Sequence, residues 1–512
     1  MARSTTDRVV AAVALGLLHG PIALIESGCS IPDLPLVADA SALGSGPDAT
    51  SVEAGGDDAG SAVADAGTDG SDASDGSFLI AAACTPGSSL CTDASAYAVC
   101  VDAGTAYAAT VCPVDCSNVG APHCRALYPS APVAAADLTA GGPAPTTIAA
   151  GVTIFNTNDG SISGALTRPS NSVAGHLEVI AGVAFHQDGE TGIWSFGDLT
   201  IAAGATVKVI GVDAAALVSS GTLTVRGVID ARPMDGTGTL CPQTAVAGPG
   251  GFPGGDGTCN CGPGGNFGLP GAGPGGGGAG SVNPHASGPP TPEGGGAGHA
   301  APGGRGAYVY GSAQTAYTSG GLAYDDAGGG SAGGSSATGT GRGGGGGVVS
   351  LVARYAVSIG DGTAIEGINA GGCGGWQGGG GGSGGTIFVE APFVQLLSQA
   401  TLAANGGGGG TADPDASAPG PPGGLNASPT LGYGWAPAIS GATSGCAGVG
   451  PGGAGNSPAG GDTPACAGSG GGGGAAGYVF VRTAAETPTV QGAVISPTVD
   501  SGAAVFQTAD VH

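Results

Sequence analysis

The sequence has little of what a nucleic-acid-binding face or a large enzyme core requires. Charged residues make up 9% of the 512 residues, aromatic residues make up 4%, and Lys208 is the single lysine. A nucleic-acid partner needs a basic face that displaces counterions, and 11 basic against 37 acidic residues do not supply one. Large apolar side chains, which normally build a catalytic core, are also few. We therefore expect a solvated acidic protein with no nucleic-acid partner.

Long hydrophobic runs are scarce as well. Residues 9–18 form a 10-residue apolar run, whereas a membrane-spanning helix needs about 20 residues. Arg3 and Arg8 precede this run, a pattern typical of a secretory signal peptide. The sequence thus predicts a signal peptide over residues 1–28 and an exported chain.

The cysteine after this segment stands in a context that resembles a bacterial lipobox. Ser27 and Gly28 are small residues before Cys29, whereas Glu26 departs from the family pattern, which prefers leucine or a similar residue. The resemblance implies that Cys29 is diacylated and anchors the chain to a membrane, and Ser30 implies sorting to the outer membrane. The alternative is an ordinary signal peptide cut near Gly28, with Cys29 paired in a disulfide.

An acidic segment over residues 29–77 follows. Between Ala38 and Gly76 it has nine acidic residues and no basic ones, and the rest is mostly alanine, glycine and serine. Such a composition buries too little apolar surface to offset chain entropy, which predicts an extended tether. A calcium loop is the alternative, but the aspartates at 65, 69, 72 and 75 lack the every-second-residue spacing of such loops.

Cysteine usage predicts disulfides. The chain has 13 cysteines, so 12 remain if Cys29 carries a lipid, and an even number fits an exported protein. Six of them lie within 41 residues and define a predicted disulfide module over residues 78–128, whose pairing the spacing leaves open. Because this module lacks the C-x2-C knuckles of zinc sites, we expect no metal and no other cofactor. The disulfide candidates are Cys84, Cys91, Cys100, Cys112, Cys116, Cys124, Cys241, Cys259, Cys261, Cys373, Cys446 and Cys466.

Short β-type runs separated by turn residues fill residues 133–235. Residues 199–201 (LTI) match residues 223–225 (LTV) at an offset of 24. One turn of a parallel β-helix takes about this many residues, and self-similarity at a fixed period is typical of a solenoid. We predict a parallel β-helix here. An immunoglobulin-like sandwich of antiparallel strands is the competing interpretation.

Glycine dominates residues 236–512, with strands interspersed. Runs of five glycines stand at 343–347, 378–382, 406–410 and 470–474, and three of them lead into β-type runs. Val349 and Leu351 align with Ile387 and Val389 at an offset of 38. We interpret the region as further solenoid turns joined by long glycine-rich loops. Such loops are either mobile or laid together as a bundle of polyproline-II strands that bond laterally.

No catalytic signature stands out. The G-x-S-x-G matches at 329–333 and 381–385 fall in glycine runs without the strand and helix that a nucleophile elbow needs. His176 and His186 lie near Asp188 and Glu190, which suggests a histidine–carboxylate site, but such residues are more often solvated turn positions. We therefore assign no catalytic residue.

Together, the lipobox-like Cys29, the acidic tether and the glycine-run-plus-strand repeats resemble glycine-rich bacterial surface lipoproteins of the PGRS type. The resemblance implies an exported protein at the outer membrane or cell surface, structural or adhesive in function and without evident catalytic activity. Its partners would be the membrane, through the lipid on Cys29, and glycans or surface proteins. The alternative is a carbohydrate-active β-helix enzyme, either a polysaccharide lyase or a glycosidase.

Overall fold

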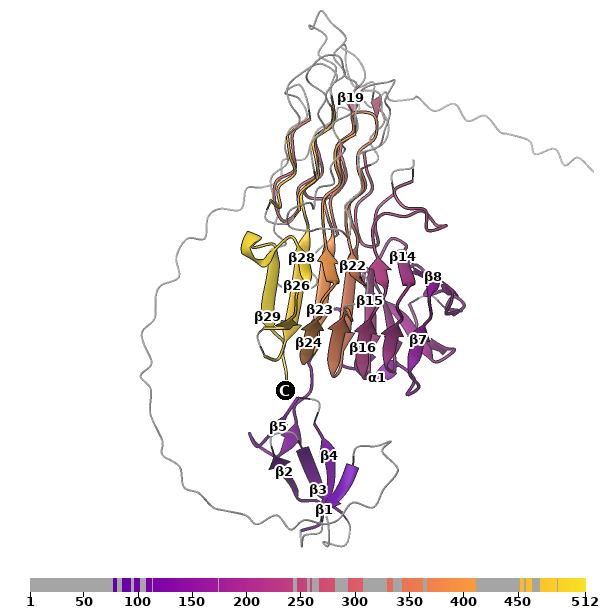
Figure 1. Cartoon of the computed structure of the whole chain (residues 1–512). Coiled ribbons are helices and arrows are strands. Elements are labelled where there is room, and N and C mark those ends of the chain that lie inside the picture. The colour runs from indigo at the N-terminus through magenta and orange to yellow at the C-terminus, as the bar shows by residue number, and fades with distance from the viewer. Residues whose placement is uncertain are drawn as a thin grey trace, which may run out of the picture. The chain divides into compact units, whose positions relative to one another are not determined.

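The computed structural model describes two groups of strands and a set of glycine-rich segments (Figure 1). The described residues are 77–80, 85–93, 96–101, 107–112, 114–173, 175–242, 246–255, 258–259, 267–280, 293–306, 329–334, 343–361, 366–410, 452–454, 457–462, 470–485 and 487–512. The predicted signal peptide, Cys29 and the acidic tether up to residue 76 lie outside them, as do Cys84, Cys261, Cys446 and Cys466, whereas the last tether residue, Ser77, begins a strand.

The cysteine-rich region forms antiparallel strands. One sheet has the order β1 (Ser77–Ile80), β4 (Tyr107–Val111), β3 (Ala96–Cys100) and β2 (Ser89–Asp93), and a second pairs β5 (Cys116–Ser117) with β6 (His123–Cys124). Disulfides join Cys91 to Cys116 and Cys112 to Cys124, and Cys100 is disulfide-bonded as well. Covalent bonds of this kind stabilise a unit that is too small to bury a sufficient core.

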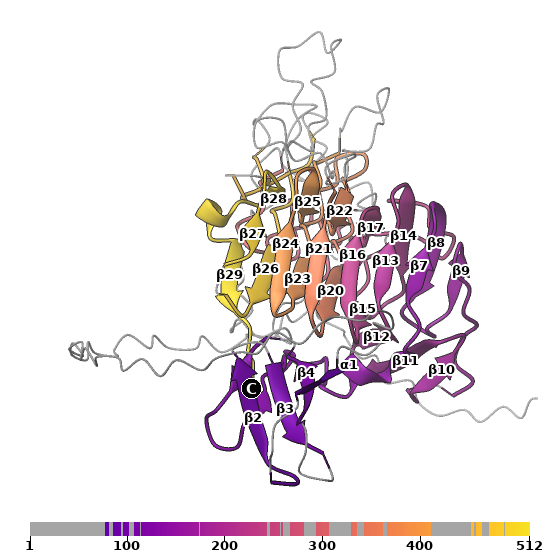
Figure 2. The ribbon, with the colours of Figure 1, turned by 60° about the horizontal axis from the view of Figure 1, so that its bottom comes forward.

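Three sheets of mostly parallel strands form the body, as the turned view in Figure 2 shows. The eight-stranded sheet has the order β10 (Glu178–Ile180), β11 (Val183–Asp188), β12 (Thr191–Phe196), β15 (Ala214–Ser219), β20 (Val348–Ala353), β23 (Thr386–Glu390), β26 (Tyr478–Thr483) and β29 (Ala504–Thr508). The six-stranded sheet has the order β27 (Thr489–Val490), β24 (Phe393–Leu396), β21 (Ala356–Ile359), β16 (Thr222–Val225), β13 (Leu199–Ile201) and β7 (Thr146–Ile148). The seven-stranded sheet has the order β28 (Val494–Ser496), β25 (Ala400–Ala403), β22 (Glu366–Asn369), β17 (Val228–Asp230), β14 (Ala205–Ile210), β8 (Gly151–Asn156) and β9 (Ile162–Gly164).

Very little else is regular in the described residues. A four-residue helix α1 (Asp137–Ala140), a 3-10 turn η3 (Val499–Ser501) and a small ribbon of β18 (Thr258–Cys259) and β19 (Phe267–Gly268) complete the elements. The expected all-β class is therefore confirmed. The parallel pairing also rules out the immunoglobulin-like alternative for the body, because the sheets of that sandwich are antiparallel.

Strand order follows a simple rotation from β13 onwards. Successive strands of the body join the six-stranded, the seven-stranded and the eight-stranded sheet in turn, up to β29. The offsets seen in the sequence are the register of this pairing: Leu199 lies opposite Leu223, and Val349 opposite Ile387. Sequence self-similarity thus reflects hydrogen-bonded neighbours.

One continuous hydrophobic core lies among the three sheets. Leu223, Ile229 and Leu351, one from each sheet, are fully buried in it. At the β12 end, Phe155 and Phe185 pack against the ring of Trp194, and Phe196 packs against Phe155. Small β-branched and leucine side chains fill the rest, and this explains how so few aromatic residues suffice.

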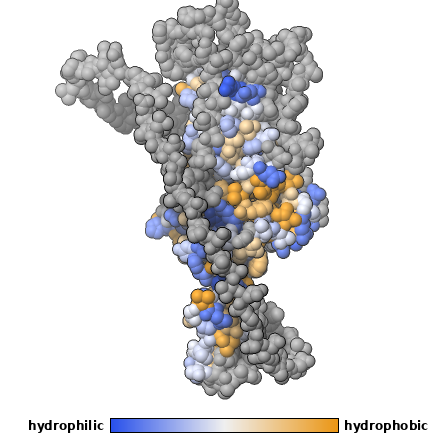
Figure 3. Space-filling view, turned by 90° about the vertical axis from the view of Figure 1, so that its left-hand side faces the viewer, coloured by the Kyte–Doolittle hydropathy of each residue, from blue (hydrophilic) through white to orange (hydrophobic). Residues whose placement is uncertain are grey.

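The last strands are short and close to prolines. β27 has two residues and follows Pro488, and β28 has three and precedes Pro497. Short edge strands and proline discourage pairing with another chain. Figure 3 faces the side of Figure 1 where β28 and β29 lie and shows apolar side chains gathered on the body there; the exposed apolar residues of this end include Val490 and Val499.

The described glycine segments bond laterally through their backbones. Gly381 N donates to Gly472 O, Gly407 N to Gly382 O and Gly474 N to Gly407 O, with N···O distances of 2.8–2.9 Å. These bonds join three of the four five-glycine runs, and Figure 1 shows such segments side by side beyond the strands. A disulfide between Cys241 and Cys373 ties two of the glycine-rich connections together. Of the two alternatives for these runs, lateral packing therefore holds for the described segments.

Candidate functional site

Two features of the body could engage a ligand, and the first is a row of uncharged polar side chains on the outer face of the six-stranded sheet. The strand register places one residue per strand in this row, each beside the next. We call it the hydroxyl row; its members are Thr147, Thr200, Thr224, Ser358, Gln395 and Thr489. Because inward and outward side chains alternate, their neighbours Leu199 and Ile201 point into the core.

The hydroxyl row is open to solvent. All six residues are exposed or half-buried, and within the described part of the chain none of their side chains forms a hydrogen bond. Neighbouring strands lie about 4.8 Å apart, so the row presents a repeat of that length over about 24 Å. Phe393, which is 50% exposed, and Tyr355, which is 37% exposed, lie on adjacent strand ends, where Phe393 N donates to Tyr355 O. The face therefore combines regular hydroxyls with two aromatic rings.

The second feature is a cavity beneath a segment that crosses the outer face of the eight-stranded sheet. We call residues 127–138 the strap. Its apolar residues Leu127, Val133 and Leu138 are buried against outward side chains of the sheet, among them Ile193 and Val218. This packing explains why the outer face of this sheet is apolar near β12 and β15.

A buried polar network fixes the middle of the strap. Ser130 donates from its backbone N and from its Oγ to the two carboxylate oxygens of Glu390, each at 2.8 Å. Arg482 donates to Ser130 Oγ and lies 3.9 Å from the Glu390 carboxylate. Burial raises the pKa of Glu390, while the Ser130 hydrogen bonds and the Arg482 charge oppose that shift.

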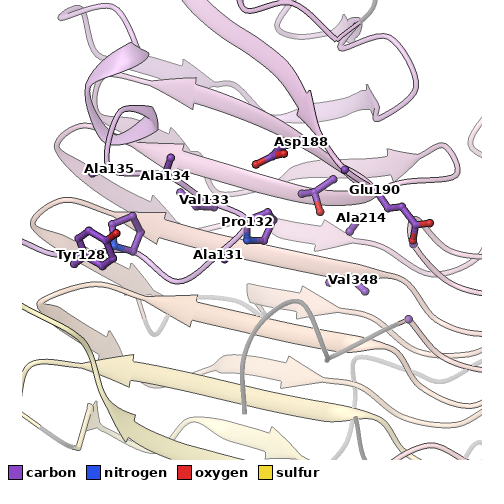
Figure 4. A pocket seen from close by; sticks show the side chains of 15 residues that line it. Tyr128, Ala131, Pro132, Val133, Ala134, Ala135, Asp188, Glu190, Ala214 and Val348 are labelled. Atoms are coloured by element: carbon purple, nitrogen blue, oxygen red, sulfur yellow. The ribbon is translucent and has the colours of Figure 1, made fainter. Parts of the chain in front are cut away.

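The cavity has a volume of about 650 Å³. Its walls are the strap, the turn between β11 and β12, and glycines from two glycine-rich segments, and its floor includes Ala214 and Val348. Figure 4 shows Tyr128 at one end and Glu190 at the other. The lining residues are Tyr128, Pro129, Ala131, Pro132, Val133, Ala134, Ala135, Asp188, Gly189, Glu190, Thr191, Ala214, Gly250, Gly329 and Val348.

Charge in this lining is of one sign. Among the described residues of the lining, Asp188 and Glu190 are the only carboxylic acids, and none is a lysine, arginine or histidine. Asp213 lies close by and accepts a 2.8 Å hydrogen bond from Gln187. Burial raises the pKa of Asp213, and the charge of Glu190 raises it further. The electrostatic potential around Asp188, Glu190 and Asp213 is therefore negative.

The residues that the sequence grouped as a candidate histidine–carboxylate site separate in the structure. Asp188 and Glu190 line the cavity, whereas His186 lies on β11 with its Nε2 3.6 Å from Asp137 Oδ1. His176 sits in an exposed turn, where its carbonyl accepts from Asn171. The expectation of solvated turn positions thus fits His176 but not His186, because the strap and α1 cover β11.

Among the described residues, no group of three or more histidine, cysteine, aspartate or glutamate side chains is arranged to hold a metal ion. Cys259 ends strand β18, and its neighbour Cys261 is outside those residues. Within the same part of the chain, no helix is long and apolar enough to cross a bilayer.

Comparison with known proteins gives no relative. No family model, no curated protein and no solved structure matches this chain. The resemblance to glycine-rich surface lipoproteins therefore remains a prediction from composition and short motifs.

Sequence reasoning missed the strap and the cavity. The strap lies where the predicted disulfide module ends and the predicted β region begins. Its apolar residues show no helical or strand period, and its partner Glu390 is 260 positions away. The only sequence signal was the unusually apolar outer positions of the eight-stranded sheet, such as Ile193 and Val218, which require a cover.

Proposed function

We propose that this chain is an exported structural or adhesive surface protein that holds its partner on the hydroxyl row. In this proposal the body is a parallel β-helix. The rotation of strands through three sheets supports that description, as does the single core that the sheets share. The glycine segments would then form a polyproline-II bundle on one side of the body, which their lateral backbone bonds support.

The hydroxyl row is the observation on which the adhesive function rests. Threonine and serine hydroxyls both donate and accept, so a regular row of them suits a partner with repeating hydroxyl or amide groups. Phe393, which is 50% exposed, adds a ring face on which a sugar can stack. The row itself carries no charge in a protein of net charge −26, which favours a neutral partner such as an uncharged glycan.

Export and anchoring form the second part of the proposal. The disulfides Cys91–Cys116, Cys112–Cys124 and Cys241–Cys373, together with the bonded Cys100, support folding in an oxidising compartment. We propose that Cys29 carries the lipid and that the acidic segment after it is the tether at the outer membrane or cell surface. Radiolabelled palmitate should enter the wild-type chain in a bacterial host and not the Cys29→Ala variant. Equal labelling of the two would contradict anchoring by Cys29.

Adhesion is tested with an array of neutral and charged glycans and the full chain. We expect binding to neutral glycans that falls at least 10-fold in a Thr200→Lys/Thr224→Lys variant, because two ammonium groups would interrupt the row. The matched control is Val152→Lys/Thr206→Lys, a paired couple on the outer face of the seven-stranded sheet. Equal loss in both variants, or no glycan binding by the wild type, would overturn the proposal. Release of new reducing ends from a bound polysaccharide would instead favour the carbohydrate-active enzyme.

A further inference from the structure

The cavity beneath the strap is built to take a ligand of defined chemistry. Its volume of about 650 Å³ lies in the range of small-molecule sites, which extends from about 300 to 1,000 Å³. Pro132, Val133, Ala214 and Val348 give it an apolar interior. A ligand that fits must therefore have an apolar body of several carbon atoms.

The strap holds the cavity in shape without a ligand. Ser130 is fixed by Glu390 and Arg482, and Ala134 N donates to Asp137 Oδ2 at 2.8 Å. Tyr128 N donates to Asp510 O at 2.8 Å. Hydrogen bonds thus anchor one end and the middle of the roof, and the packing of Leu138 against the sheet holds the other end, so little ordering is required on binding.

The carboxylates at the rim of the cavity determine which charge the polar end of a ligand can carry. Asp188 and Glu190 stand on either side of Gly189 in the turn that joins β11 to β12, and both are exposed. The described residues of the lining include no basic side chain, so these carboxylates repel an anion, whereas a cation is attracted by both of them and by nearby Asp213.

We propose that this cavity binds a primary alkylammonium ion. The ammonium group would lie between the carboxylates of Asp188 and Glu190, which accept its N–H hydrogen bonds. The alkyl chain would run under the strap along Val133, Ala214 and Val348. This site is separate from the hydroxyl row, which lies on a different sheet, so the two proposals can fail independently.

Titration calorimetry of the full chain with three probes of equal length tests the site: n-octylammonium chloride, octan-1-ol and sodium octanoate. We expect octylammonium to bind at least 10-fold more tightly than octan-1-ol, because the carboxylates attract the ammonium charge and accept stronger hydrogen bonds from it than from a neutral hydroxyl. Octanoate should not bind. The affinity for octylammonium should fall as salt is added, because the attracting carboxylates are exposed.

Variants separate the two parts of the site. Asp188→Asn/Glu190→Gln should weaken octylammonium binding at least 10-fold and leave octan-1-ol unchanged. Asp57→Asn/Asp58→Asn, which removes the same charge from the acidic segment, should change neither. Ala214→Leu, which fills the floor, should weaken both probes. Since Asp188 and Glu190 are exposed, the first variant stays informative even if Ala214→Leu does not fold.

The contrary outcomes are distinct. Equal affinities for octylammonium and octan-1-ol, or no effect of Asp188→Asn/Glu190→Gln, would overturn the ammonium site. Binding of calcium chloride that is lost in that variant, without octylammonium binding, would reassign the carboxylates to a divalent cation. If Asp57→Asn/Asp58→Asn also weakened octylammonium binding, the effect would come from the net charge of the protein and not from the site. That result would also overturn the proposal.

Discussion

At the scale of single residues, His299 is a buried titratable side chain among the glycine segments. It is fully buried, with its Nδ1 2.6 Å from Gly384 O, so Nδ1–H donates to that carbonyl. Its ring packs edge-on against Tyr478 at a centroid distance of 5.0 Å. Burial lowers the pKa of His299 from 6.5 to about 4.

This shift predicts a loss of stability in mild acid. Below pH 6.5 the unfolded chain binds a proton at this histidine, whereas the folded chain does not until about pH 4. Each pH unit in that window costs about 1.4 kcal/mol, so the free energy of unfolding should fall by about 3 kcal/mol between pH 6.5 and 4. Urea unfolding at several pH values measures it, and His299→Gln should remove this part of the slope.

Two buried carboxyl groups change the free energy of unfolding with pH in the direction opposite to His299. The pH dependence of the wild type must therefore be compared with that of His299→Gln. Burial raises the pKa of Glu366 and of Glu390. Their stabilising contribution is present at low pH and is lost as the pH rises through their folded-state pKa values. Both contributions are common to the wild type and His299→Gln, so only the difference between the two slopes reports on His299. Parallel slopes would contradict the prediction.

Some residue roles could be predicted from the sequence and others could not. Trp194 lies close to Ile193 and Phe196 in the sequence, which predicts a core position, and its side chain is fully buried. Arg168 is only 1% exposed, although arginine is almost never fully buried unless it is paired. Its guanidinium donates to carbonyls of Gly160, Val183 and Glu178, among other acceptors. No local pattern predicts this, because the acceptors come together only after the chain has folded.

At the scale of elements, the positions of strands could be predicted because their inward residues must be branched and apolar. The matching β-type runs 199–201 and 223–225 fall in β13 and β16. Inward positions of these strands must be branched and apolar to fill the core. The sequence did not predict β15 and β25, because they are rich in alanine, which is uncommon in strands. The small alanine side chain is accommodated where neighbouring segments pack closely.

The glycine runs could be found in the sequence, but the reason for them is visible only in the structure. At Gly381, an added Cβ would lie 2.0 Å from Gly407 O, and at Gly474 it would lie 2.1 Å from Gly382 O. The backbones approach so closely that a side chain does not fit. Composition alone left open whether such runs pack or move.

Replacing one of these glycines should therefore destabilise the protein. Gly381→Ala places a methyl group against the Gly407 carbonyl while Gly381 N is bonded to Gly472 O. We expect a loss of about 1–3 kcal/mol in the free energy of unfolding, which is typical of an overpacked interior. Urea titration followed by circular dichroism measures this loss.

The matched control is Gly236→Ala, where nothing lies within 4 Å of an added Cβ. That substitution should be close to neutral, within about 0.5 kcal/mol. If Gly381→Ala were as stable as Gly236→Ala, the glycine segments would have space for a methyl group. Close backbone packing would then not explain their composition.

At the scale of the whole molecule, the contacts that complete the fold link distant positions. Ser130 and Glu390 are 260 positions apart, and Ser130 and Arg482 are 352 apart. The sequence gives the period of the strands but not which segment covers which face, because one serine and one glutamate carry no signal of pairing. For this reason the offset of 24 predicted which strands are neighbours, whereas the hydroxyl row and the cavity were found only in the structure.

The end of the described chain secures the strap. Ala126 and His512 exchange backbone hydrogen bonds at 2.7 and 3.0 Å, Leu127 bridges Val511, and the ring of Tyr128 contacts that of His512. We call residues 509–512 the clasp. Its pairing holds the first residues of the strap, while the Glu390 network holds the middle.

Removing the clasp should therefore loosen one end of the strap. In a chain lacking residues 509–512, we expect amide hydrogens of residues 126–128 to exchange at least 10-fold faster, because their acceptors Asp510 and His512 are gone. Amides of β20 and β23 should keep their protection. Hydrogen exchange with mass spectrometry measures both regions. His512→Ala is the control, since it removes the ring contact and keeps the backbone bonds, so it should leave exchange nearly unchanged. Unaltered protection of residues 126–128 after the deletion would show that the clasp does not hold the strap.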